Sequence, residues 1–502
     1  MFWKLSKKLA ATYAKIEKNK HVGWSEFVIK KVFALLTLVG LASMASPAFA
    51  EEDIFTITQQ AGYTEALEIN KPKASIVIDG THGQILWAEN PDMAREPASI
   101  SKMMTVFLVF DAIKDGKLTL DTPIKATEND QAISQLYAIS NSKIVAGVEY
   151  PVRELLKMVT VPSSNVATVM LANAVSDNDA GAFVRSMNEK AQKIGMKQTN
   201  FYNCSGASAA SFDGLYNPEG FDPYGSNVST ARDLATMVFY LINDHPEVLE
   251  FTNQPNVTTM AGTPYEESFE TYNYSLPGAK YGIEGVDGLK TGSGPSSAFN
   301  YIATAKRGDT RLIEVILGVG DWSDQDGEYY RHPFGNALLE KTFKDYEYQL
   351  VLPKGSHTIN GKDIQLAEDF YAVSKKDENP ALSIQDDQLV LSQGLEQAAD
   401  TMPKLATSYR DIERTQPLKE AKPPSLPETL GKTATAVNEP FYLIAIVVAG
   451  LVSLLISMLL PAKTTASRSR KKQSSFLTIV FRSIGILCLL SAVGLFIVNI
   501  FK

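Results

Sequence analysis

Apolar and β-branched residues gather in two pairs of short segments, and each pair flanks a glycine-containing turn. This pattern is typical of β-hairpins. The segments with their turns are 74–79, 80–83 and 84–88 in the first hairpin, and 298–305, 306–309 and 310–317 in the second.

Between these hairpins, apolar residues recur three and four positions apart, which predicts amphipathic helices. The clearest case is 101–114, which ends before Gly116. The other predicted helices cover 152–159, 165–175, 180–194 and 230–242. Strands at both ends of a run of helices favour an α/β domain, in which the terminal strands share one sheet and the helices form a second lobe.

The chain changes character after this main domain, which we place at 51–349. Residues 350–414 predict a small β-rich domain, with short candidate strands at 349–352, 357–359 and 388–391. Residues 415–439 contain four prolines and few large apolar side chains. Such a composition indicates an extended linker.

The first 50 residues have the pattern of an export signal. Lys30 and Lys31 precede a 13-residue apolar stretch, and Ala48-Phe49-Ala50 has the small-x-small form of a cleavage site. The apolar stretch suits a signal peptide better than a membrane span. An uncleaved anchor is the alternative interpretation.

The C-terminal end predicts membrane anchoring. Residues 440–461 include a 20-residue run without charge, which is long enough to cross a bilayer. A basic loop follows at 462–475, and residues 476–502 form a second apolar segment that either spans the membrane or lies on it as an interfacial helix. The positive-inside rule places the basic loop in the cytoplasm and the main domain outside the cell membrane.

The charge distribution excludes several classes of function. The formal net charge of −8 divides into +6 on residues 1–50, +7 on residues 461–502 and −21 on the remainder. An acidic body argues against nucleic acid as a partner. The two cysteines and five scattered histidines form no metal-binding motif, so we expect neither a metal nor another cofactor.

The first of three short motifs is Ser99-Ile100-Ser101-Lys102. Ser99 and Lys102 lie three positions apart and share one face of a helix. A serine hydroxyl needs a nearby base to become a nucleophile, and a buried lysine can lose its proton and serve as that base. Taken alone, the motif fits an N-cap serine with a surface lysine better.

The second motif, Ser163-Ser164-Asn165, precedes an apolar helix. Ser163 can pass a proton between the reacting centre and Lys102, and Asn165 can hold both Lys102 and a substrate amide. A plain helix N-cap explains this motif equally well when it stands alone.

The third motif is Lys290-Thr291-Gly292. Lys290 and Thr291 suit the terminal carboxylate of a substrate, and Gly292 leaves room for a substrate backbone beside the strand edge. Alone, the motif reads as a glycine-rich surface turn.

The order and spacing of the three motifs are more specific than any one of them. Ser163 follows Ser99 by 64 residues, and Lys290 follows Ser163 by a further 127. This combination is the signature of penicillin-binding proteins and class A β-lactamases.

Longer segments carry a closer resemblance, to the low-molecular-mass penicillin-binding proteins of the serine-type D-alanyl-D-alanine carboxypeptidase family. It covers residues 55–350 strongly and 350–412 loosely. The segments that carry it are PASISKMMT at 97–105, STARDLA at 229–235, VDGLKTG at 286–292 and YIATAKRGDTRLIEVILG at 301–318.

The resemblance implies a β-lactamase/transpeptidase-like fold, with an antiparallel sheet flanked by helices, and an acyl-enzyme mechanism. Ser99 would attack the D-Ala-D-Ala carbonyl of a peptidoglycan stem pentapeptide, D-alanine would leave, and water would hydrolyse the ester. Lys102 would accept the proton and Ser163 would shuttle it. β-Lactam antibiotics would acylate the same serine. The implied substrate-binding residues are Asn165, Lys290, Thr291 and Gly292.

The sequence departs from the family pattern in three places. Ser164 stands where this family often has glycine, and the segment from Cys204 to Ser208 differs from the usual continuation. The family usually has an amphipathic C-terminal anchor, whereas this tail resembles true membrane spans.

Other functions share parts of this pattern. A serine β-lactamase would use the same nucleophile, but the deacylating glutamate of class A enzymes has no counterpart between Asn165 and Lys290. A non-catalytic penicillin-binding sensor would share the fold, although all three motifs are intact. A Ser-His-Asp hydrolase is disfavoured, because the chain has no GxSxG motif.

Overall fold

The computed structural model describes residues 52–376, 378, 380–391 and 395–412. The expected signal segment, the linker and both expected membrane segments lie outside these residues. Within the described part of the chain, no helix is both long and apolar enough to cross a membrane.

Five antiparallel strands form the central sheet in the order β2-β1-β9-β8-β7. β1 pairs with both β2 and β9, so the two predicted hairpins share one sheet and this prediction is confirmed. β7 forms one edge of the sheet. The strands are β1 (Ala74–Asp79), β2 (Ile85–Glu89), β7 (Val286–Gly294), β8 (Ala298–Arg307) and β9 (Thr310–Val319).

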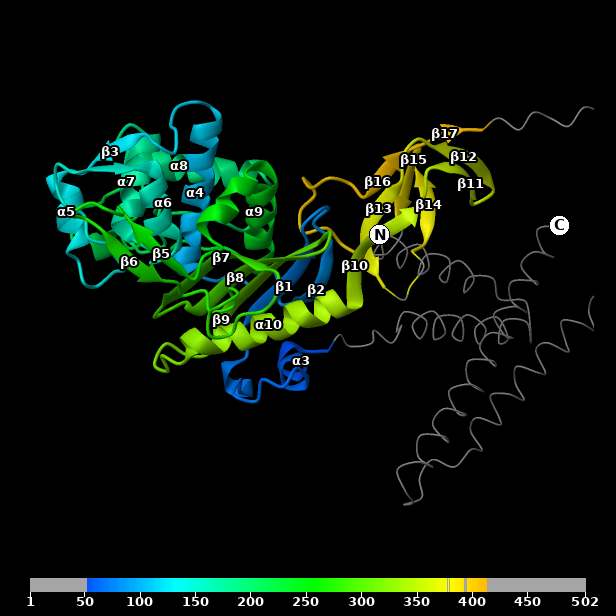
Figure 1. The fold of residues 1–502 in the computed structure, drawn as a ribbon, viewed down its shortest axis with the longest axis horizontal. Helices are drawn as coiled ribbons and strands as arrows, with labels where there is room; N and C mark the ends of the chain where they lie inside the picture. Colours follow the sequence, from blue (N-terminus) through cyan, green and yellow to red (C-terminus); the bar gives the residue numbers. More distant parts are fainter. Residues whose placement is uncertain (1–51, 377, 379, 392–394, 413–502) are drawn as a thin grey trace, which may run out of the picture. The chain divides into compact units, whose positions relative to one another are not determined.

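The sheet is covered on both faces. On β1, Ile76 and Ile78 belong to one apolar cluster and Val77 to another, because successive side chains of a strand point to opposite faces. The first cluster lies against the helical lobe, and the second lies against helices α3 (Ile54–Gln60) and α10 (Gly327–Asp345) (Figure 1). Burial of both faces explains why every residue of β1 is buried.

The helical lobe agrees with the predicted helices to within one or two residues at most ends. Two small two-stranded antiparallel sheets accompany them, β3 (Pro123–Lys125) with β4 (Glu149–Pro151) and β5 (Asn256–Thr259) with β6 (Glu267–Glu270). The helices are α4 (Lys102–Lys114), α5 (Glu128–Ser134), α6 (Val152–Thr160), α7 (Asn165–Val175), α8 (Ala180–Lys193) and α9 (Ala231–Asp244).

Residues beyond α10 form small antiparallel sheets around a separate apolar cluster that includes Ile364, Phe370 and Leu389. This region, which we call the small domain, is β-rich as predicted. Its strands are β10 (Tyr346–Leu352), β11 (Gly355–Ile359), β12 (Lys362–Leu366), β13 (Phe370–Lys375), β14 (Leu382–Gln385), β15 (Gln388–Leu391), β16 (Ala406–Ser408) and β17 (Arg410–Asp411).

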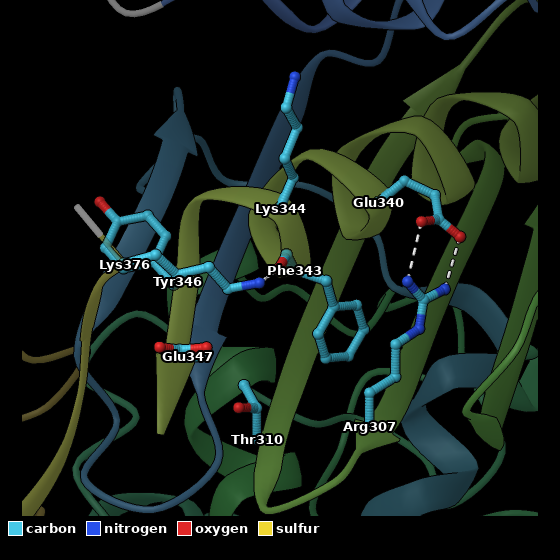
Figure 2. A pocket seen from close by; sticks show the side chains of 8 residues that line it. All are labelled: Arg307, Thr310, Glu340, Phe343, Lys344, Tyr346, Glu347 and Lys376. Carbon is cyan, nitrogen blue, oxygen red and sulfur yellow. Dashed lines mark hydrogen bonds and ion pairs between the residues drawn. The ribbon is translucent and has the colours of Figure 1, made fainter. Parts of the chain in front are cut away.

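A surface hollow of about 310 Å³ lies where α10 runs into β10 (Figure 2). Three of its charged side chains have partners. Arg307 pairs with Glu340, and the Lys376 amine donates to the carbonyl oxygen of Phe343 at 2.8 Å. No residue of the three sequence motifs lines it. The hollow therefore belongs to the junction between domains and not to the candidate chemistry.

Candidate active site

Ser99 lies in the 3-10 helix η2 (Ala98–Ser101), which continues into α4 at Lys102. Lys102 Nζ lies 2.9 Å from Ser99 Oγ and donates to the carbonyl oxygen of Ser205, also at 2.9 Å. The Lys102 side chain is fully buried, and this burial lowers the pKa of its amine from 10.5 to about 7. A large fraction of Lys102 is therefore neutral at physiological pH and can accept the Ser99 proton.

Two glycines lie closely against the turn that carries Ser99. A Cβ at Gly292 would lie 2.6 Å from the Pro97 carbonyl oxygen and 3.0 Å from the Ser99 amide nitrogen. A Cβ at Gly206 would overlap the Ala98 carbonyl, and Gly206 also has a positive φ of 90°. Both positions thus require glycine. From the sequence we expect Gly292 to leave room for a substrate backbone, but the Cβ side of this residue faces the nucleophile segment itself.

Ser163 and Asn165 lie at the start of α7, which packs against α4. Ser163 has a positive φ of 64°, is 6% exposed, and its hydroxyl has no partner in the described structure. The Asn165 side-chain amide donates to the Ser140 carbonyl at 2.8 Å, while its oxygen has no partner. Among the described residues, no hydrogen bond joins Asn165 to Lys102, contrary to the expectation from sequence.

Lys290 and Thr291 lie on β7 and are both buried. The Lys290 amine donates to the Thr291 carbonyl oxygen at 3.1 Å. Burial lowers the pKa of Lys290 well below its ordinary value, and the neighbouring Lys102 and Arg331 lower it further. The described residues place no carboxylate in an ion pair with any of these three bases. An anionic ligand here would meet basic groups that have no carboxylate in a direct ion pair.

Arg331 is a site residue that the sequence analysis missed. It comes from α10, is 1% exposed, and donates from Nη1 to Ser293 Oγ at 2.9 Å and to the Asn300 carbonyl at 3.3 Å. Ser293 directly follows the third motif on β7. Burial lowers the pKa of Arg331 to about 10, so the guanidinium stays charged at neutral pH. No short motif marks Arg331, and its helix was itself not predicted.

The segment 203–206 is a second feature that the motifs did not identify. Asn203 Oδ1 accepts hydrogen bonds from the amides of Gly206, at 2.6 Å, and Ser205, at 3.2 Å. Thr105 of α4 donates to the Cys204 carbonyl at 2.6 Å. These bonds fix the Ser205 carbonyl that Lys102 contacts. The departure of Cys204–Ser208 from the family pattern was the only signal in the sequence.

Sequence comparison identifies the family of this fold. Residues 60–321, more than half of the chain, match the peptidase S11 family, described as D-alanyl-D-alanine carboxypeptidase. The chain belongs to this family. All three motifs of this sequence lie within the matched range. A second match, at 348–410, is to a domain of unknown function, DUF1958.

Individual relatives agree with this membership. D-alanyl-D-alanine carboxypeptidase DacF of Bacillus subtilis is 27% identical over 315 residues, which cover 62% of this chain and 70% of DacF. DacC of Escherichia coli is 30% identical over 249 residues, covering 49% of this chain and 56% of DacC. This chain therefore matches only part of the length of each carboxypeptidase.

Solved structures show the same fold. Penicillin-binding protein 6B of Escherichia coli superposes with a TM-score of 0.52 at 25% identity, covering 68% of this chain and 95% of that protein. A peptidoglycan synthesis regulatory factor, PBP3, of Streptococcus pneumoniae superposes with a TM-score of 0.58 at 23% identity, covering 68% of this chain and 99% of that one. The expected penicillin-binding-protein fold is confirmed.

Proposed function

We propose that this chain removes the terminal D-alanine from peptidoglycan stem pentapeptides through an acyl-enzyme on Ser99. The observation that carries the proposal is the 2.9 Å contact between Ser99 Oγ and the buried Lys102 amine, whose pKa is about 7. Membership of the D-alanyl-D-alanine carboxypeptidase family supports the same reaction.

Acylation follows from this geometry. Neutral Lys102 takes the Ser99 proton as Oγ attacks the penultimate carbonyl carbon and forms a tetrahedral intermediate. Backbone amides, including that of Ser99, would stabilise its oxyanion. The bond to the departing D-alanine nitrogen then breaks, and the proton held by Lys102 passes to that nitrogen. The unpaired Ser163 hydroxyl is suited to relay this proton.

Deacylation reverses the roles. Lys102 is neutral again after D-alanine leaves, so it can take a proton from a water molecule that attacks the ester carbonyl. The Ser99–carbonyl bond breaks, Ser99 regains a proton, and the shortened peptide leaves. A β-lactam would follow the first half of this path, but its leaving nitrogen stays tethered after the ring opens. The tethered group remains where the water must approach.

A pentapeptide assay tests the function directly. We expect the chain to release one D-alanine per pentapeptide, seen as a product one alanine lighter by mass spectrometry, and to hold a fluorescent penicillin covalently. Rapid turnover of the penicillin with an intact pentapeptide would favour a β-lactamase. Penicillin labelling without turnover of either compound would favour a sensor. Either result would contradict the proposal.

Lys290 should act on the carboxylate of the substrate. A bound carboxylate supplies the negative charge that favours the ammonium form of Lys290 and offsets its lowered pKa. Lys290→Ala should reduce kcat/KM for a peptide with a free C-terminus by about 10- to 100-fold, the effect of losing a charged hydrogen bond of roughly 1.5–3 kcal/mol. The same peptide with an amidated C-terminus is the control, and it should lose little. Equal losses for the two peptides would rule out this role.

The place of action is also part of the proposal. We propose that the catalytic domain works outside the cytoplasm, held at the cell membrane by the apolar C-terminal segments. The support is the sequence pattern of 1–50 and 440–502. Digestion of the catalytic domain by protease added to intact wall-free cells would support this location, and protection would contradict it.

A further inference from the structure

Residues 395–402, which we call the strap, lie between β15 and β16 of the small domain. β15 and β16 pair with each other, so the chain leaves the small domain and returns to it. The orange part of the trace in Figure 1 follows this excursion. During it, the strap contacts the catalytic domain.

Backbone hydrogen bonds join the strap to the turn of the first hairpin. The Ile85 amide donates to the Glu396 carbonyl at 2.8 Å, and the Ala398 amide donates to the Gly83 carbonyl at 2.9 Å. The Gln397 side chain donates to the His82 carbonyl at 2.7 Å. The strap thus pairs with this turn through an isolated antiparallel β-bridge between Gln84 and Gln397.

The strap also completes the catalytic core. Ala398, Ala399 and Met402 are buried and belong to the same apolar cluster as α4 and α9. A Cβ at Gly83 would overlap the Met402 sulfur, and Gly83 has a positive φ of 70°. The catalytic domain therefore has a tight seat for Met402, as expected of a built contact and not of a chance one.

The strap also contacts the start of the segment that leads to the Ser205 carbonyl beside Lys102. Thr401 Oγ1 donates to the Ile194 carbonyl at 2.7 Å, at the end of α8. The Tyr240 hydroxyl of α9 donates to the Thr401 carbonyl at 2.6 Å. From Ile194 the chain runs on to Ser205, whose carbonyl oxygen accepts the hydrogen bond from Lys102.

The intervening segment is held to neighbours at each step. The Gln198 amide donates to Asp233 Oδ2 at 2.7 Å, Asn200 and Val228 exchange backbone bonds at 2.9 and 3.0 Å, and the Tyr202 amide donates to Asn227 Oδ1 at 2.7 Å. These bonds join the segment to residues 227–233 at the start of α9, and Tyr240 of the same helix contacts the strap. The strap therefore holds both Ile194, where the segment begins, and the helix to which the segment is bonded, so that a displaced strap allows the segment and α9 to shift together.

We propose that the small domain, through its strap, is a positioning element of the active site: it fixes residues 194–206 and thereby the Ser205 carbonyl against which the Lys102 amine is placed. This gives the domain of unknown function a role within the proposed carboxypeptidase reaction, on which the inference rests. The competing interpretation is that the strap only covers apolar surface. The two differ in whether release of the strap changes the chemistry of Ser99 at temperatures where the fold is intact.

The test uses the full chain with Gly83→Ala, which displaces Met402 without changing the sequence of the strap or of residues 194–206. Gly116→Ala is the matched control, because Gly116 has a similar positive φ of 75° but nothing within 4 Å of its Cβ position. The double variant Gly83→Ala/Met402→Ala removes the overlap again. Each is compared with the unaltered chain in the rate and pH profile of acylation by a fluorescent penicillin, and in the amide exchange of residues 196–206.

We expect Gly83→Ala to slow acylation at least five-fold at pH 7, to move the midpoint of the acylation profile to higher pH as water reaches Lys102, and to speed amide exchange at 196–206. Gly116→Ala should change none of these, and the double variant should recover part of the loss. A lower melting temperature with unchanged acylation and exchange would overturn the proposal, as would equal effects in Gly116→Ala. If the unaltered chain reacts with no penicillin, the proposed function has failed. The amide-exchange comparison alone then tests whether the strap positions residues 196–206.

Discussion

Replacing Ser99 with alanine is expected to abolish both D-alanine release and covalent penicillin labelling while the fold persists. The Ser99 hydroxyl is the reacting atom in the proposed mechanism, and its position 2.9 Å from Lys102 Nζ cannot be taken over by water at comparable efficiency. Loss of a nucleophile of this kind costs about 10⁴-fold or more in kcat. Penicillin labelling measured by mass spectrometry of the intact chain, together with pentapeptide turnover, checks the result.

Ser101→Ala is the control for this experiment. Ser101 lies two residues away in η2, and its buried hydroxyl also lacks a partner. It should leave labelling at Ser99 in place. If Ser99→Ala retained labelling and Ser101→Ala lost it, the nucleophile would be Ser101 and the assignment of the first motif would be wrong.

The rate of acylation is expected to fall as the pH drops below about 7, close to tenfold per pH unit. Lys102 must be neutral to take the Ser99 proton, and burial lowers the pKa of its amine to about 7. At lower pH the amine is protonated and cannot serve as the base. The groups around it are Ser99 Oγ, the Ser205 carbonyl, the Cys204 thiol, whose pKa burial raises to about 11, and Lys290. None of them places a carboxylate beside the amine.

Stopped-flow acylation by a penicillin from pH 5 to 9 measures this dependence. Lys102→Met keeps the length of the side chain without a base, and it should lose activity at every pH. The pH dependence of the free energy of unfolding is an independent check on the pKa of Lys102. The pKa of Lys102 is lower in the folded chain than in the unfolded one, so the unfolded chain binds more protons between about pH 7 and 10.5, and the free-energy cost of burying this residue becomes smaller as the pH rises. A rate that is flat down to pH 5 would exclude neutral Lys102 as the base.

The helices around Ser99 could be predicted, whereas α10 could not. Helices such as α6 are amphipathic because one face meets solvent, and this gives a clear 3.6-residue period. α10 is buried over much of its surface and contains Pro333, Gly335 and the buried polar residues Arg331 and His332. Gly335 has a local reason, since its Cβ would lie 2.6 Å from the carboxyl of Glu314 on β9. Packing requirements of this kind leave no 3.6-residue period in the sequence.

α3 was missed for the opposite reason. Its sequence, IFTITQQ, is rich in β-branched residues that favour strands. The helix forms because Asp53 caps its first amides and because Ile54 and Ile57 are buried against the sheet and α10. Tertiary packing thus outweighs local propensity here, and no reading of seven residues alone could show that.

The motifs located Ser99, Lys102 and Lys290 because their chemistry depends on residue type and spacing. They could not show which backbone groups complete the site. The Ser205 carbonyl beside Lys102 and the contact between Gly292 and the Ser99 amide depend on how distant segments fold together. The contact of the strap is harder still to predict, because it pairs residue 398 with residue 83 through backbone groups that every sequence carries.

Burial of Met402 among catalytic-domain helices has a consequence for synthesis of the chain. The last helix of the catalytic domain ends at Asp345, 57 residues before Met402. At translation rates of about 5–20 residues per second, those residues take roughly 3–11 s to be made. Throughout that interval the emerging domain exposes the seat at Gly83 and the surface at Gly195, against which Ala399 and Thr401 pack, and only the later segment covers them. The nascent chain therefore exposes this apolar surface to misassociation during the whole period, although its helical lobe has already left the ribosome.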